Sequence, residues 1–171
     1  MIKLSTSFAA PALVALVALA SGTAWAAGLA KPDQEFLEKA AIGNLFEIEA
    51  GKMALARGKK EDVKLLGEQS VKDHTKNAQE LAQLAAAKGV KLPTELPADR
   101  KKKLEAWAAS KNFDGLYLSA LGYNSHSQDM ALFEKASKEA KDKDVRAYAA
   151  KTLPVLKMHN RAAHGSLTNK S

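Results

Sequence analysis

The spacing of apolar residues is the feature that most constrains the fold of this 171-residue chain. Apolar and small residues recur three and four positions apart over four long stretches, which indicates amphipathic helices rather than strands. We expect these helices over about 32–57, 61–88, 113–140 and 142–167. Gly58 and Gly89 follow the first two stretches and are typical helix stops. The sequence therefore predicts an all-α fold.

The connections between these stretches predict how the helices pack. Short connections follow the first and third long helices, and short connections make antiparallel neighbours. The connection between the second and third is long and contains Pro93 and Pro97, which disfavour helix before them. A short helix over about 98–110 fits inside it. One long crossover is the connectivity of a ferritin-like bundle. We therefore expect a ferritin-like four-helix bundle with a short extra helix in the crossover between helices two and three.

The first residues of the chain predict export. Lys3 precedes an uncharged apolar run over 8–20, and Ala24-Trp25-Ala26 provides the small residues that signal peptidase needs. The run is shorter than the ~20 apolar residues that span a bilayer, so an uncleaved anchor is the weaker alternative. We expect a signal peptide over 1–26, cleavage after Ala26, and a single helical domain over 27–171 in the periplasm. No transmembrane span is expected after cleavage, and outer-membrane association stays open.

Composition excludes several classes of protein. The chain has no cysteine, which excludes a lipoprotein anchor, disulfides and thiolate metal ligands. Its net charge is +7, but no arginine-rich stripe with interleaved aromatic residues is present, so we expect no nucleic-acid binding. Weak association with anionic components of the envelope is compatible with this charge. The sequence identifies no protein partner.

Four ionisable residues fall on the apolar faces of the long helices. Placed about 100° apart around each helix, Glu47, His74, His126 and His159 point inward, one from each long helix. Each also lies near the middle of its helix. Because every residue advances an α-helix by about 1.5 Å, mid-helix residues of an up-and-down bundle meet at one level. We therefore predict one layer that contains a carboxylate and three imidazoles.

Two interpretations of this layer remain open. The first is a metal site, because imidazole and carboxylate ligands suit divalent transition metals such as zinc, copper, nickel or iron. The second is a metal-free hydrogen-bond network that fixes the register of the helices in a structural or stress-related envelope protein. Buried polar groups must be paired, and a network pairs them without a metal.

Catalytic motifs are missing from the sequence. A di-iron carboxylate bundle needs Glu-x-x-His on two helices. Val71, Tyr123 and Leu156 occupy the positions three residues before the inward histidines. No phosphate-binding loop, His-Glu-x-x-His or Gly-x-Ser-x-Gly motif occurs either. We therefore expect no catalytic residues and no enzymatic activity.

Four stretches of the chain resemble a known bacterial family, the domain of unknown function 4142, whose members are described as predicted periplasmic or outer-membrane proteins. The similarity lies in 40–54, 71–77, 113–118 and 153–159. It implies a ferritin-like bundle in the envelope and no particular activity. One departure is Asn124-Ser125 before His126, where the family often has Asp or Ala. The family motif positions that match here are Glu47, His74, Asp114, Tyr117, His126 and His159. From its place near a helix start, we expect Asp114 either to cap its own helix or to favour that helix start through its charge.

Overall fold

The structure is a computed structural model that describes residues 28–168. The predicted signal peptide over 1–26 lies outside the described residues. The described part is helical throughout apart from its connections, which agrees with the all-α prediction. Its elements are α1 Lys31–Arg57, α2 Glu61–Ala87, α3 Ala98–Ala109, α4 Phe113–Ser119, a π-helical segment η1 Ala120–Asn124, α5 Ser125–Glu139 and α6 Lys143–Thr168.

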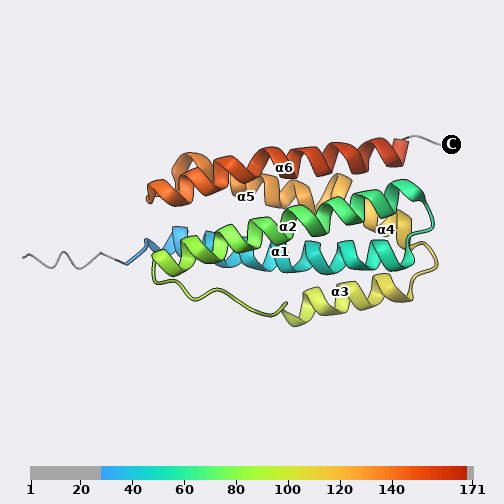
Figure 1. The fold of residues 1–171 in the computed structure, drawn as a ribbon, viewed down its shortest axis with the longest axis horizontal. Helices are drawn as coiled ribbons and strands as arrows, with labels where there is room; N and C mark the ends of the chain where they lie inside the picture. Colours follow the sequence, from blue (N-terminus) through green and yellow to red (C-terminus); the bar gives the residue numbers. More distant parts are fainter. Residues whose placement is uncertain (1–27, 169–171) are drawn as a thin grey trace, which may run out of the picture.

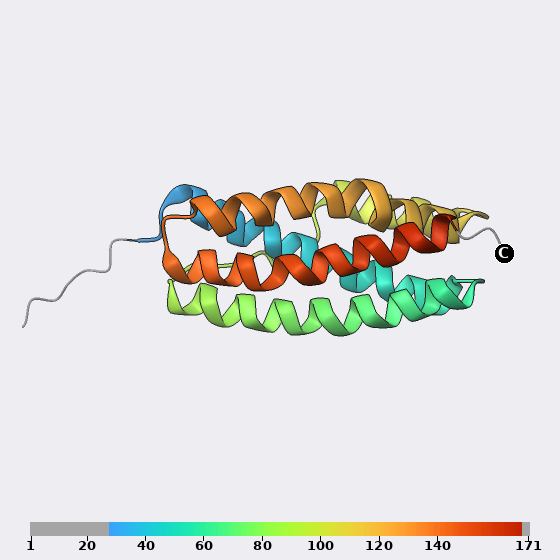
Figure 2. The same ribbon diagram turned by 90° about the horizontal axis from the view of Figure 1, so that it is seen from above.

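Two antiparallel helical pairs form the bundle (Figures 1 and 2). One pair is α1 and α2. The other consists of α6 and the continuous run of α4, η1 and α5. Helix α6 packs against α2, and α5 packs against α1. The connection between the pairs runs back along the bundle, with α3 outside and beside α1 (Figure 1). No helix within 28–168 is long and apolar enough to cross a membrane.

Glycine allows α1 and α2 to approach closely. A Cβ atom on Gly51 would lie 2.8 Å from the Gly67 carbonyl oxygen, and a Cβ on Gly67 would lie 2.7 Å from the Ala54 Cβ. Both distances are shorter than any ordinary contact, so only glycine fits at either position. The backbones therefore meet along this seam, and side chains farther along α1 and α2 are held at a fixed separation.

The third predicted helix is interrupted. A single helix was expected over 113–140, but the structure has α4, then the π-helical segment η1, then α5. A π-helix carries one more residue per turn than an α-helix allows, and such segments are most frequent at functional sites. The π-helical segment ends at Asn124, and His126 is the second residue of α5.

Two aspartates tie the helical pairs together at opposite ends. Asp33 in the first turn of α1 is 2% exposed and accepts hydrogen bonds from the backbone N–H groups of Lys141 and Asp142, at 3.0 and 2.7 Å. Asp114 in the first turn of α4 accepts from the N–H groups of Lys59 and Lys60, with the shortest distance 2.9 Å. Asp114 lies in the first turn of α4, where a negative charge favours a helix start, but it makes no capping hydrogen bond to its own helix. Its carboxylate instead binds the turn between α1 and α2, because that turn has N–H groups without helical partners.

The apolar core is divided in two. One cluster gathers around Phe36, Phe133 and Tyr148, and the other gathers around Phe46, Tyr117 and Leu121. The buried polar side chains other than Asp33 lie between the two clusters, at about the middle of the long helices. The fold therefore places a polar layer between two apolar ends.

Candidate metal centre

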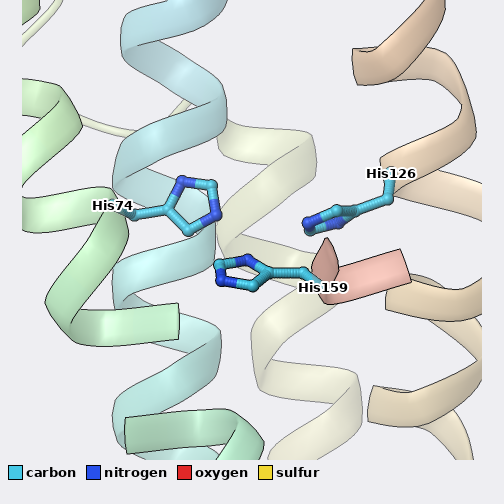
Figure 3. A group of neighbouring side chains, drawn as sticks. All are labelled: His74, His126 and His159. Carbon is cyan, nitrogen blue, oxygen red and sulfur yellow. The ribbon is translucent and has the colours of Figure 1, made fainter. Parts of the chain in front are cut away.

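Three imidazoles converge in the middle of the bundle. His74 comes from α2, His126 from α5 and His159 from α6, and their rings point toward one another (Figure 3). All three are buried, with exposed fractions between 0 and 3%. One ring nitrogen from each can be chosen so that the three lie within 4.8 Å of one another. Within the described residues, the structure thus brings three of the four predicted ligands to one point.

Hydrogen bonds fix the tautomer of His74. Its Nδ1 lies 2.9 Å from Asn44 Oδ1, and the same oxygen accepts from Asn77 Nδ2 at 3.0 Å. An amide oxygen only accepts, so His74 Nδ1 carries the proton and donates. The lone pair of the neutral ring is therefore on Nε2, which is buried and has no hydrogen-bond partner.

His159 is held in the same manner but through its other nitrogen. Its Nε2 donates to Asp73 Oδ2 at 2.8 Å, and Gln69 Nε2 donates to the same oxygen at 2.8 Å. This arrangement leaves Nδ1 buried and unpartnered. A carboxylate or amide that holds the outer nitrogen of a histidine orients the ring and raises the basicity of the inner nitrogen. Asn44 and Asp73 therefore prepare two rings as ligands.

His126 lies between the other histidines and Glu47. Neither of its nitrogens has a hydrogen-bond partner, and its Nδ1 is 3.6 Å from Glu47 Oε1. That separation is too long for a hydrogen bond. Glu47 therefore sits beside the three-histidine cluster, next to His126 Nδ1, which leaves the Nε2 of His126 to face the other rings. Both carboxylate oxygens of Glu47 are buried without a partner.

Burial controls the protonation of this layer. It lowers the pKa of His126 to about 3, with the nearby His159 contributing, and it also holds the pKa of His74 well below its usual value. Both rings are therefore neutral at physiological pH and need not lose a proton before they bind a cation. Burial also raises the pKa of Glu47 to about 8, and the Asp129 carboxylate adds to this rise.

Cations from the crossover helix lie near Glu47. Arg100 and Lys103 of α3 both lie over the Phe46 ring, 5.3 and 5.2 Å from its centroid. Their charges act on Glu47 and Asp129 and partly oppose the rise in the pKa of each carboxyl. Helix α3 thus brings positive charge to the acidic side of the layer, which leaves the histidine side as the more favourable place for a metal cation.

A cavity reaches the histidine cluster from outside. It has a volume of about 110 Å³ and lies between α2 and α6. Asp73 and His74 line it together with Asn77, Glu80 and Lys151. The cavity therefore connects His74, and the carboxylate of Asp73 that binds His159, with the surface of the bundle.

The two remaining family motif positions, Asp114 and Tyr117, contact other parts of the fold rather than the histidine cluster. Asp114 holds the turn between α1 and α2, as described above. Tyr117 of α4 is fully buried in the apolar cluster beside Glu47, and burial together with the Glu47 charge raises the pKa of its hydroxyl. Neither residue reaches the three histidines as a ligand.

Sequence reasoning missed the residues that orient the rings. Asn44 lies three residues before Glu47 on α1, and Asp73 directly precedes His74 on α2. Helical periodicity places Asp73 only at the edge of the inward face of α2 and does not single out Asn44. Their sequence positions could have indicated them. Asn44 lies about one helical turn from the inward Glu47 and Asp73 lies next to the inward His74, so both can reach the same layer.

Comparison with known proteins identifies the family and the fold. The model of the family described as "Domain of unknown function (DUF4142)" matches residues 18–165, so the chain belongs to this family. A comparison with curated protein sequences found no match. Among solved structures, CopM in the Cu(I)-bound form is similar with a TM-score of 0.68 and 15% identity, over 80% of this chain and 96% of that chain. CopM in the Cu(II)-bound form gives 0.68 and 14%, over 81% and 97%. At this identity the similarity shows a shared fold.

Proposed function

We propose that this protein is a periplasmic copper-binding protein that holds the metal between His74, His126 and His159. The observation that carries the proposal is the convergence of three buried imidazoles whose ring nitrogens lie within 4.8 Å of one another. Histidine nitrogens bind such metals at ~2.0–2.1 Å, so two ligands of one ion lie at most ~4 Å apart. A contraction of roughly 1 Å, within reach of small side-chain rotations, would complete the site.

The unpaired nitrogens favour metal binding over a metal-free network. His74 Nε2, His159 Nδ1 and both nitrogens of His126 are buried without a partner. A buried polar atom without a partner costs about 1–3 kcal/mol, and native structures contain few such atoms. A layer that only fixed helix register would pair these atoms with one another. The arrangement instead leaves nitrogen lone pairs of the three rings available at one point. On two of the rings the other nitrogen is held by a hydrogen bond, to Asn44 for His74 and to Asp73 for His159.

Copper is favoured among the metals that imidazole can bind. Imidazole suits zinc, copper, iron and nickel alike, so the ligands alone do not select one metal. The shared fold with CopM, described in Cu(I)-bound and Cu(II)-bound forms, supports copper. We further propose a ferritin-like four-helix bundle, on the connectivity of the two helical pairs, and a binding rather than a catalytic role. Export to the periplasm rests on the sequence of residues 1–26.

Metal titration of the mature protein tests this proposal. We expect one copper ion per chain for residues 27–171 purified without chelator, measured by elemental analysis and by competition with a chromogenic chelator. His126→Ala removes a ligand and should lose this binding. His164→Ala is the matched control, because His164 is exposed on the same bundle. Wild-type protein that binds none of copper, zinc, nickel or iron would refute a metal site, as would equal binding by the His126 variant.

A further inference from the structure

The π-helical segment η1 sets the direction of His126 relative to the buried residue Leu121. Leu121 and His126 are both 0% exposed and lie five residues apart. In a regular α-helix, the residues that share a face with Leu121 are three and four positions later, at 124 and 125. One turn of π-helix instead places residue i+5 above residue i. After η1 the α-helical spacing resumes, since buried Phe133 follows His126 by seven residues, or two turns.

One side chain of α6 binds the backbone of this segment. Asn160 Nδ2 donates to the carbonyl oxygens of Leu121 and Gly122, at 3.1 and 2.7 Å. A π turn interrupts the regular hydrogen-bond ladder of a helix, and its backbone groups are where a side chain can insert. Asn160 directly follows His159 in sequence. The residue that clamps η1 is therefore adjacent to one ligand, and η1 leads directly to another.

The contact between η1 and α6 is close because of a glycine. A Cβ on Gly122 would lie 3.4 Å from the His164 backbone nitrogen and 3.3 Å from the Leu167 Cδ1. Both distances are tight for an added methyl group. The backbone of η1 thus lies directly against α6, and the short side chain of Asn160 can reach it.

We propose that Asn160 is a positioning residue of the metal site, which fixes His126 and His159 relative to each other by locking η1 to α6. This inference rests on the proposed function. The lock has two parts: the π turn sets the direction of His126 around its helix, and the two hydrogen bonds from Asn160 hold that turn against the helix that carries His159. Without the lock, the α4–η1–α5 run can relax toward regular α-helix, which changes the direction of His126 relative to Leu121 and loosens its position in the cluster.

The first test substitutes the clamp. Asn160→Leu keeps the size of the side chain and removes its two donor hydrogens. We expect at least about tenfold weaker binding of Cu²⁺, as for other groups that orient metal ligands. The electron paramagnetic resonance spectrum of the Cu²⁺-loaded variant should show fewer coupled nitrogens than the three of the wild type. Arg161→Ala, the exposed next residue of α6, is the matched control and should leave affinity and spectrum unchanged. Wild-type affinity and spectrum in Asn160→Leu would overturn the proposal.

A second test removes the need for the clamp. Deletion of Asn124 takes one residue from η1, so that Leu121 and His126 become four positions apart and a regular α-helix brings both inward. In this background, Asn160→Leu should weaken Cu²⁺ binding less than twofold. An equal loss in both backgrounds would mean that Asn160 acts independently of the π turn, and would overturn the proposal.

A metal-free measurement separates this inference from the proposed function. In the apo protein, Asn160→Leu should speed amide hydrogen exchange at residues 121–127 at least about tenfold relative to α1, because local opening then becomes easier. Unchanged exchange would overturn the lock whether or not metal binds. If the wild-type chain bound no copper while exchange still increased, the proposed function would fail and the lock between η1 and α6 would stand.

Discussion

The protonation of Glu47 predicts how the stability of the metal-free protein depends on pH. Burial raises the pKa of this carboxyl from 4.5 to about 8 in the folded chain. Between these values, the folded state keeps a proton that the unfolded state has released. The free energy of unfolding therefore falls as pH rises through this range. The substitution Glu47→Gln removes the titration and keeps the shape of the side chain.

The buried histidines act in the opposite direction and define where Glu47 can be observed. Burial lowers the pKa of His126 from 6.5 to about 3 and lowers that of His74 as well. Their stabilising contribution is present above pH 6.5 and is lost as pH falls below it. From pH 6.5 to 8, Glu47 dominates the slope among these three groups. That slope approaches about 1.4 kcal/mol per pH unit and halves at the pKa, so Glu47 alone should cost about 1.6 kcal/mol over this range. The two histidines, half protonated in the unfolded chain at pH 6.5, offset about half of this loss, which leaves about 1 kcal/mol for the wild type.

Urea unfolding at pH 6.5 and pH 8.0 measures this difference. The metal-free wild type should be less stable at pH 8.0 by about 1 kcal/mol, whereas Glu47→Gln, which keeps only the opposing histidine contribution, should lose no stability over the same range. Glu49→Gln is the matched control, because Glu49 is exposed on the same helix and pairs with Lys52. It should behave as the wild type. A Glu47 variant that loses stability as steeply as the wild type would refute a buried, protonated Glu47.

Three further predictions follow from packing and hydrogen bonding. Gly51→Ala should destabilise by about 1–3 kcal/mol because its Cβ has no room, whereas Gly43→Ala, whose nearest neighbour is 3.9 Å away, should stabilise by about 0.5–1 kcal/mol, both measured by thermal unfolding. Asp33→Ala should cost about 2–3 kcal/mol in urea unfolding and more than Asp114→Ala, because Asp33 is the more buried of the two; an equal cost would contradict this reason. Asp73→Asn should weaken copper binding about tenfold with little change in thermal midpoint, and unchanged affinity would show that its hydrogen bond does not orient a ligand.

The helices themselves follow from local sequence signals. Gly58 ends α1, and Gly89 with a φ of +68° ends α2 in the left-handed conformation that glycine adopts without strain. Pro93 and Pro97 keep the start of the crossover out of helix. The inward direction of His74 and His159 follows from periodicity alone, because α2 and α6 are regular over these residues.

The π turn could not be predicted from the same periodicity. A single buried residue at i+5 instead of i+4 hardly changes the amphipathic pattern of a long helix. The run from Phe113 to residue 140 is therefore predicted from sequence as one regular helix. Contacts with α6 favour the π turn over a regular α-helix. Asn160 of α6 binds the backbone of η1, and Gly122 of η1 approaches α6 closely. Such a choice depends on a contact between segments far apart in sequence.

The hydrogen bonds around the layer also depend on tertiary structure. The sequence predicted Glu47 as a fourth metal ligand; in the structure its Oε1 lies 3.6 Å from His126 Nδ1, and the charges of Arg100 and Lys103 on α3 act on it. The packing of α1 against α2 through glycines brings Asn44 to His74. Neither separation is encoded in the period of one helix.

Asp33 and Asp114 each bind the turn of the opposite helical pair, and this determines how the chain can be divided. Asp33 binds the turn of the second helical pair, and Asp114 binds the turn of the first. Each pair thus carries the anchor for its neighbour's turn, and Lys88 at the end of α2 adds ion pairs to Asp142 and Asp144 of the second pair. A chain cleaved within the 88–97 connection should reassemble from its two fragments, and two intact copies could exchange pairs through the same anchors. The architecture is suited to circular permutation and to domain-swapped dimers at high protein concentration.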